Sequence, residues 1–271
     1  MDLNIKSLYK LILCICFFNQ LAFAQKPADS SQTKKPLFFS AIVIDAKYGM
    51  FLALGDMQTN FRNGVDFGAR VNYFSRTNWI FALEGQYFFN DKIRTDMVAN
   101  LRNAQGFIVD KYGVSNDVKQ GMRGFFLSAS VGKLFLIQPQ KRQRVGIETR
   151  LAVGYLQHWI RIKNTNRDLI QLSGDYIKGY DHLHAGVGVQ PYVGFRYMSK
   201  NRLINLFGGL DLLMGFTKNQ RAWNYDEQKA DKALKVDLMP SFRVGISIPF
   251  TIYNSAHEQD EDIEIFEVRP K

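Results

Sequence analysis

The stretch GVDFGARVNYFSRTNWIFALEGQYFFN, residues 64–90, decides the fold. From 64 to 75 and again from 78 to 90, large apolar side chains occupy alternate positions, and small, polar or charged residues occupy most of the positions between them. Successive side chains of a strand point to opposite faces, so this period of two predicts two strands that each have one apolar face. The polar pair Arg76-Thr77 predicts a tight turn between them and hence an antiparallel pair.

The same alternation continues outward in both directions, and the sequence offers no convincing long amphipathic helix. Eight strand-like segments result, of which the first and seventh alternate less clearly than the others. They cover residues 46–56, 64–75, 78–90, 122–137, 144–159, 182–198, 202–216 and 235–252.

The connections between these segments distinguish two kinds of all-β protein. A soluble β-sandwich also has alternating strands, but its strands average about 5–6 residues, and these segments are about twice as long or longer. Short and long connections also alternate along the chain, as they do between the periplasmic turns and extracellular loops of bacterial outer-membrane barrels. We therefore expect an all-β fold: a closed, antiparallel, up-and-down transmembrane β-barrel of eight strands.

The composition is compatible with a membrane barrel. Mean hydropathy is -0.19, which alone would indicate a soluble protein. In a barrel strand only every second side chain faces lipid, so averaging over both faces hides the membrane signal. Aromatic residues make up 14% of the chain, as expected where aromatic girdles mark the two membrane interfaces.

The first 24 residues have the features of a secretory signal peptide. Lys6 and Lys10 precede an apolar run over 11–18, and Ala22-Phe23-Ala24 provides a small-residue cleavage site. Both cysteines lie inside this segment, so no disulfide or thiol chemistry is expected in the mature chain. The expected organisation is a signal peptide (1–24), a periplasmic leader (25–43), an outer-membrane barrel (44–253) and an acidic periplasmic tail (254–271).

Charged residues on the inward face are nearly balanced in sign. An eight-stranded barrel is just wide enough for its side chains to fill it, so these residues predict a buried ion-pair network. A narrow ion-selective pore and a catalytic carboxylate cluster are the alternatives. The expected members are Asp66, Arg70, Glu84, Glu148, Arg150, Arg196, Asp211, Asp237 and Arg243.

No motif indicates an enzyme, a cofactor or a metal. His182 and His184 would share one strand face and could form a metal pair, but no third histidine lies near them in the sequence. A Gly-x-Ser-x-Gly nucleophile motif is absent. We therefore expect a protein that is not an enzyme and has no cofactor and no catalytic or metal-binding residues.

The net charge of +10 does not indicate nucleic acid in an exported protein. Many of the cations, including Lys92, Arg94, Arg161 and Lys163, fall in or near the expected extracellular loops. Outer-membrane lipid and the phosphates of lipopolysaccharide are the expected partners of these loops, and docking of a partner protein is the alternative.

The final segment, RVGISIPF over 243–250, resembles the β-signal read by the bacterial barrel-assembly machinery. The matching positions are the polar Arg243, Gly245, the apolar Ile248 and the aromatic Phe250. Barrels with this signal usually end on the aromatic residue, whereas this chain continues for 21 residues. The resemblance implies the assembly machinery as a transient partner.

The continuation beyond Tyr253 is acidic but also contains the apolar residues Ile263, Ile265, Phe266 and Val268. A merely solvated tail has no need of them. Besides a disordered tail, a segment that adds a strand to a periplasmic protein or lipoprotein is therefore an open alternative.

Over residues 46–253, the strand pattern and the terminal β-signal resemble those of the small outer-membrane barrels of Bacteroidota. Within that group, the long second loop and the tail are compatible with the accessory barrels of type IX secretion, of the PorG kind. That resemblance implies an anchor or scaffold for an envelope complex. Two alternatives stay open: a self-contained structural or adhesive barrel resembling outer-membrane protein A or X, and a small porin-like pore or lipid-modifying enzyme.

Overall fold

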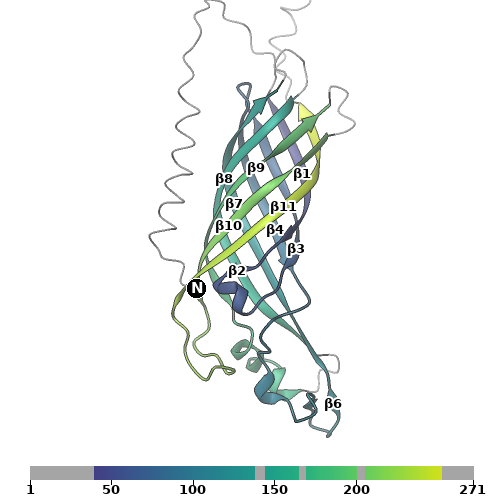
Figure 1. The fold of residues 1–271 in the computed structure, drawn as a ribbon, viewed down its shortest axis with the longest axis vertical. Coiled ribbons are helices and arrows are strands. Elements are labelled where there is room, and N and C mark those ends of the chain that lie inside the picture. The colour runs from purple at the N-terminus through teal and green to yellow at the C-terminus, as the bar shows by residue number, and fades with distance from the viewer. Residues whose placement is uncertain (1–39, 138–143, 165–168, 200–204, 252–271) are drawn as a thin grey trace, which may run out of the picture. The chain divides into compact units, whose positions relative to one another are not determined.

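The computed structural model of the chain describes residues 40–137, 144–164, 169–199 and 205–251 (Figure 1). Eight long antiparallel strands follow one another around a sheet, and the first pairs with the last over Ala41–Phe51, so the sheet closes on itself. The ring strands are β1 (Ala41–Phe51), β3 (Gly64–Phe74), β4 (Trp79–Phe89), β7 (Val118–Leu136), β8 (Arg144–Asn164), β9 (His184–Met198), β10 (Asn205–Asn219) and β11 (Leu234–Thr251).

The remaining elements are short and lie in the connections. Strand β2 (Leu54–Gly55) adds to the edge of β11, and β5 (Ile108–Val109) pairs with β6 (Ser115–Asn116) in a separate hairpin. The described connections also contain four single-turn 3₁₀ helices: η1 (Asp56–Thr59), η2 (Ala99–Leu101), η3 (Ile170–Leu172) and η4 (Tyr176–Gly179). Within the described ranges, no helix is long and apolar enough to cross a membrane.

The closed eight-stranded up-and-down barrel predicted from the sequence is confirmed. The position of the first strand was wrong: β1 begins at Ala41, five residues before the expected segment 46–56. The expected leader boundary at residue 43 therefore falls inside β1. The reason is that β1 buries the charged Asp45 and Lys47 next to the apolar Val43, so its inward face has no uniform character.

The connections divide the barrel into two ends. The turn end has the connections 75–78, 137–143 and 199–204, and the loop end has the longer 52–63, 90–117, 165–183 and 220–233. In the first turn, Asn78 adopts a φ of 62°, a left-handed conformation that asparagine tolerates better than most residues. β11 finishes beside the start of β1, so the chain enters and leaves the barrel at the turn end.

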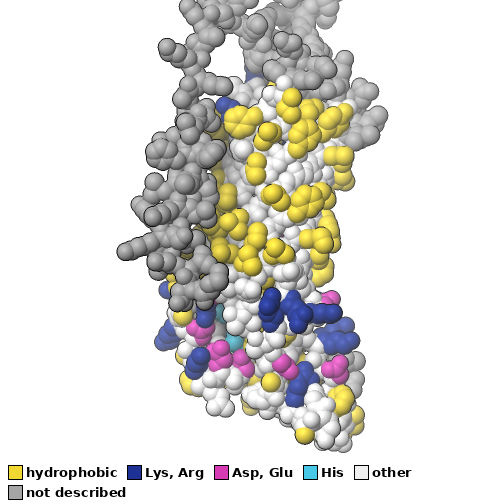
Figure 2. Space-filling model, viewed as in Figure 1, with side chains coloured by type: hydrophobic (Ala, Val, Ile, Leu, Met, Phe, Trp, Pro, Cys, Tyr) yellow, Lys and Arg dark blue, Asp and Glu magenta, His cyan; other side chains and the backbone are white. Residues whose placement is uncertain are grey.

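The outer wall of the ring carries many exposed apolar side chains, the apolar belt, and Figure 2 shows part of it on one face. Every ring strand contributes to it, because outward side chains alternate with buried ones along each strand. A soluble monomer rarely exposes more than a few hundred Å² of contiguous apolar surface, so a belt around the whole wall requires a lipid environment. Its members are Ile42, Ile44, Met50, Phe67, Val71, Phe81, Leu83, Leu127, Val131, Ile147, Leu151, Val153, Val187, Val193, Phe195, Leu206, Leu210, Phe242, Val244, Ile246, Ile248 and Phe250.

The interior of the ring consists of three layers. At the turn end, an apolar cluster contains Ala41, Val43, Phe74, Ile80, Leu134 and Met198. Charged and polar side chains fill the middle. At the loop end, a second apolar cluster combines strand residues such as Phe88, Phe126 and Leu156 with loop residues such as Met57 and Met97. The charged layer is thus covered by apolar side chains on both sides.

Candidate functional site

The charged layer is built around Arg196, whose side chain has no solvent exposure. Its guanidinium donates to both oxygens of Asp45, at 3.1 and 2.8 Å, and to Ser247 Oγ at 2.8 Å. It also donates to Glu148. Asp45 accepts in addition from Arg70 Nε at 3.0 Å. Two arginines therefore share one buried carboxylate, and Glu148 supplies a second negative charge beside them.

The network continues from Arg70 on β3 to side chains of the neighbouring strands. Glu84 accepts a hydrogen bond from Lys47 and lies 3.5 Å from Arg70 Nη1. Arg243 reaches Asp211 Oδ2 at 3.1 Å and Asp66 Oδ1 at 3.3 Å. Arg150 completes the set, at 3.7 Å from Glu148 and 3.8 Å from Glu84.

Charges of the two signs are equal in number within this network. The carboxylates are those of Asp45, Asp66, Glu84, Glu148 and Asp211, and the cations are Lys47, Arg70, Arg150, Arg196 and Arg243. Buried charges are tolerated when they are paired, and removing one partner leaves an uncompensated charge in a low dielectric. Aromatic rings add to the packing: the Arg196 and Arg70 guanidinium carbons lie 4.8 and 5.1 Å from the centroid of the Phe207 ring.

Eight of the nine residues expected for the lumen network lie in it. Asp237 does not: it is buried nearer the loop end, where Thr217 donates to it at 2.7 Å and His158 Nε2 lies 3.0 Å away. β11 places Asp237 six residues from Arg243, about three interior rungs nearer the loops. Asp45 was missed because the expected first strand began at residue 46, and Lys47 because the alternation of that strand was too unclear to assign its faces; reading the alternation from Ala41 would have found both.

A group of histidines lies beside Asp237. The rings of His158 and His184 stack with centroids 5.3 Å apart. His184 Nδ1 lies 2.8 Å from the carbonyl oxygen of His182, and His182 Nε2 lies 2.8 Å from Asp226 Oδ1. His182 has a φ of 43° and precedes β9, so it does not share a strand face with His184 as expected. Within the described ranges, no group of three or more metal-ligating side chains is placed to hold a metal ion.

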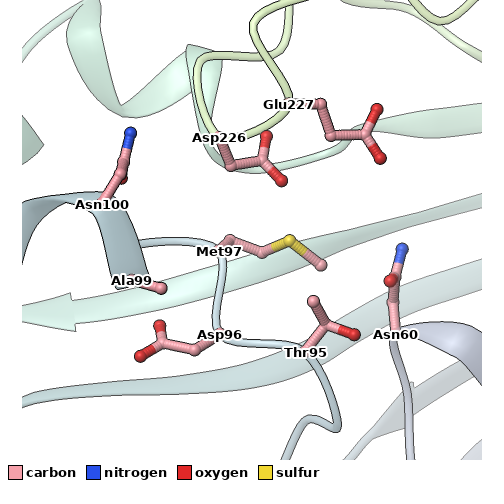
Figure 3. Close-up of a pocket in the computed structure, with 8 residues that line it drawn as sticks. All are labelled: Asn60, Thr95, Asp96, Met97, Ala99, Asn100, Asp226 and Glu227. Atoms are coloured by element: carbon pink, nitrogen blue, oxygen red, sulfur yellow. The ribbon is translucent and has the colours of Figure 1, made fainter.

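A cavity of about 240 Å³ lies where three loop-end connections meet (Figure 3). Each carboxylate in its lining already has a partner: Asp96 with Arg102 and Gln120, Asp226 with His182, and Glu227 with Lys229 at 3.4 Å. The polar side chains of the cavity therefore hold the connections 52–63, 90–117 and 220–233 in place. Its lining residues are Asn60, Thr95, Asp96, Met97, Ala99, Asn100, Asp226 and Glu227.

Asp96 holds the long connection 90–117 to the barrel. Burial would raise the pKa of its carboxyl, but the hydrogen bonds from Gln120 and Arg102 outweigh burial and hold the pKa below its ordinary value of 3.8. The Val98 amide also donates to this carboxyl, at 3.1 Å. The ionised form of Asp96 is thus the one that fits the folded loop.

The residues of the expected assembly signal occupy the turn-end half of β11. Ile248 and Phe250 point outward and are about half exposed, and Arg243 points into the charged network. A Cβ at Gly245 would lie 2.4 Å from the Ala46 carbonyl oxygen and 2.4 Å from the Phe207 ring, so no larger residue fits there without a shift. The expected partner contacts Ile263, Ile265, Phe266 and Val268, like the signal peptide, lie outside the described residues.

Comparison with known proteins gives distant structural likenesses. No protein-family model and no curated protein sequence matches the chain significantly. Among solved structures, Neisserial surface protein A matches with 13% identity and a TM-score of 0.41, over 77% of this chain and 97% of its own. Ail, the attachment invasion locus protein of Yersinia pestis, has 8% identity and a TM-score of 0.41 (78% and 99%), and OprG of Pseudomonas aeruginosa has 9% and 0.37 (79% and 97%). The assignment of the fold rests on the strand pairing of this chain itself.

Proposed function

We propose that this chain is an integral outer-membrane β-barrel without enzymatic activity, and that its filled barrel is an anchor for parts of the chain outside the membrane. The observation that carries this proposal is the charged network, which lies between the two apolar clusters. A pore needs a continuous polar path, and an active site needs access for a substrate. Asp45, Glu148 and Arg196 in the network are fully buried, so the network provides neither a polar path for ions nor access for a substrate.

The apolar belt and the arrangement of the connections support an outer-membrane location. In outer-membrane barrels short turns face the periplasm and longer loops face outward, so the turn end would be periplasmic. Lipid and lipopolysaccharide would then surround the belt, and the barrel-assembly machinery would insert the chain by reading the signal at Arg243, Gly245, Ile248 and Phe250.

We further propose that the acidic tail, residues 254–271, binds a periplasmic partner. The chain leaves the barrel at the turn end after β11, so residues 254–271 would enter the periplasm. Their four large apolar residues among acidic ones suit docking onto a periplasmic protein or lipoprotein. Together with the resemblance to the PorG kind of barrel, this favours an anchor for an envelope complex such as the type IX secretion machinery.

An affinity pulldown from detergent-solubilised outer membranes tests the anchoring role. It would compare the full chain with a chain ending at Tyr253 and with a full-length variant in which Ile263, Ile265, Phe266 and Val268 are all serine. We expect a partner that binds the full chain and is lost from both variants. A partner kept by the truncated chain would contradict a role for the tail, and no partner with any form would contradict anchoring.

A self-contained adhesive barrel is the second candidate, and the β5–β6 hairpin favours it. This hairpin lies at the loop end (Figure 1) and exposes Phe107, Val109, Tyr112 and Val114, with Tyr112 70% exposed. Exposed aromatic side chains are frequent at binding surfaces. If adhesion is the function, Phe107→Ser with Tyr112→Ser would abolish attachment of expressing cells without changing the amount of folded barrel.

A further inference from the structure

A group of cations lies on the outer wall just beyond the end of the apolar belt. Figure 2 shows Lys and Arg side chains gathered along this boundary. Arg62 in the connection 52–63 and Lys92 and Arg94 in the connection 90–117 are exposed cations that the bridge between Phe61 and Ile93 brings close together. We call these three residues the basic rim.

The backbone forces the cations of the basic rim together. Phe61 and Ile93 form an isolated antiparallel bridge, so Arg62 and Lys92 are the next residues opposite each other. The amide of Arg94 donates to the Asn60 carbonyl at 2.9 Å, and its Nε donates to the Phe61 carbonyl at 3.1 Å. Phe61 is buried, so the alternation turns Arg62 and Lys92 outward.

Like charges directly opposite each other are destabilising. Among the described residues, no carboxylate forms an ion pair with any of the three cations of the basic rim. The neighbouring carboxylate, Asp91, is engaged by Arg123 at 2.7 Å, and that guanidinium in turn lies over the Phe89 ring. Three adjacent cations without a counter-charge are suited to an anion from outside the chain.

The wall is also hollowed at this point. A cavity of about 400 Å³ is lined by Arg62, Asn63 and Arg94. The two guanidinium groups and the Asn63 side-chain NH2 are hydrogen-bond donors, the chemistry that phosphate oxygens require, and the Asn63 Oδ1 already accepts from the Ala53 amide at 3.2 Å.

The height of the basic rim on the wall indicates where the anion comes from. The last paired residues below it are Val65 and Phe89, and Phe89 packs against Phe67 and Tyr87 in an outward aromatic cluster. Arg62 and Lys92 lie three residues beyond this pair, about 10 Å along the strand direction. Because barrel strands tilt by roughly 40°, this is about 7–8 Å along the membrane normal. Headgroups extend roughly 5–8 Å beyond each side of the hydrocarbon core. The basic rim is thus at headgroup level.

We propose that Arg62, Lys92 and Arg94 bind a phosphate on the headgroup of an outer-leaflet glycolipid such as lipid A. The inference rests on the proposed membrane location and adds to it a specific lipid site. The bound lipid would lie along the wall of β3 and β4 with its acyl chains against the apolar belt.

Binding of lipid A to the purified full chain in detergent, followed by native mass spectrometry, tests this site. The probes are bisphosphorylated lipid A, the same lipid without phosphates, and inorganic phosphate. The test variant is Arg62→Gln/Lys92→Gln/Arg94→Gln. The matched control, Lys111→Gln/Lys229→Gln/Lys232→Gln, loses the same charge from loop residues outside the basic rim. Heat-modifiable gel migration would show that every variant is folded.

We expect the wild type and the control to retain bisphosphorylated lipid A, and the test variant to bind it at least roughly tenfold more weakly, the loss of one charge-assisted hydrogen bond or more. Equal binding by both variants, or equal binding of the lipid without phosphates, would overturn the site. Inorganic phosphate binding as tightly as the lipid would overturn the lipid source. Membrane fractionation of cells separates the two proposals: a barrel in the outer membrane with no phosphate preference refutes only the site.

Discussion

Replacing Arg196 by methionine tests the charged network at its centre. Methionine fills most of the arginine volume but carries no charge, so Asp45 and Glu148 lose a shared cation while Asp45 keeps Arg70. Breaking a buried ion pair by removing one partner costs about 3–5 kcal/mol. That is a large part of the total stability of a typical domain, about 5–15 kcal/mol.

The size of the effect makes it measurable by equilibrium unfolding in urea, with the barrel refolded in detergent micelles. Tryptophan fluorescence and heat-modifiable gel migration would report the folded fraction. With a destabilisation of about 4 kcal/mol and an m-value of about 2 kcal/mol per M, the midpoint should fall by roughly 2 M.

Two further variants separate charge imbalance from loss of packing. Arg76→Met removes an exposed arginine from the turn 75–78 and should leave the midpoint nearly unchanged. Arg196→Met/Glu148→Gln removes one charge of each sign, so it should be more stable than Arg196→Met alone. The reasoning is refuted if Arg196→Met unfolds at the same urea concentration as Arg76→Met, or if the double variant is the less stable of the two.

Two other predictions concern the loop end and the last strand. Because the pKa of Asp96 lies below 3.8 in the fold, its contacts should persist above that pH and be lost as the pH falls through the lower, folded pKa. Hydrogen-exchange protection of residues 96–120 should therefore decrease only below pH 3.8 in the wild type, whereas Asp96→Asn should already show low protection at pH 6. Equal protection of the two chains at pH 6 would contradict this role of Asp96. If Phe250 belongs to the assembly signal, Phe250→Ala should reduce the folded, heat-modifiable fraction in cells, whereas Phe242→Ala, an equally outward change in β11, should not; equal behaviour of the two would remove the signal.

The fold could be read from the sequence because a barrel strand has two chemically distinct faces. In β3, for example, Phe67 and Val71 face lipid while Asp66 and Arg70 face the interior, so alternation gives both the strand and its orientation. The same reading placed eight network residues in the interior. It failed for β1, where the interior face mixes Val43 with Asp45 and Lys47.

Other parts of the site depend on geometry that a sequence pattern does not contain. Asp237 occupies an inward position in the alternation of β11 and is buried. The strand tilt and register, however, place it beside His158 and Thr217 and away from Arg243. The basic rim arises from the Phe61–Ile93 bridge between two connections, and nothing in the local sequence of either predicts that contact. The tail remains an expectation from composition, since it lies outside the described residues.

A barrel filled by side chains should conduct no ions, and single-channel recording in planar lipid bilayers measures this directly. The purified, refolded chain should produce no stepwise conductance in molar potassium chloride, whereas Phe88→Ala/Phe126→Ala, which opens the loop-end apolar cluster above the charged layer, provides a comparison for leakage. The predicted result is the absence of stepwise conductance from the wild type. Reproducible, ion-selective steps from the wild type would contradict a filled barrel and establish the chain as a pore.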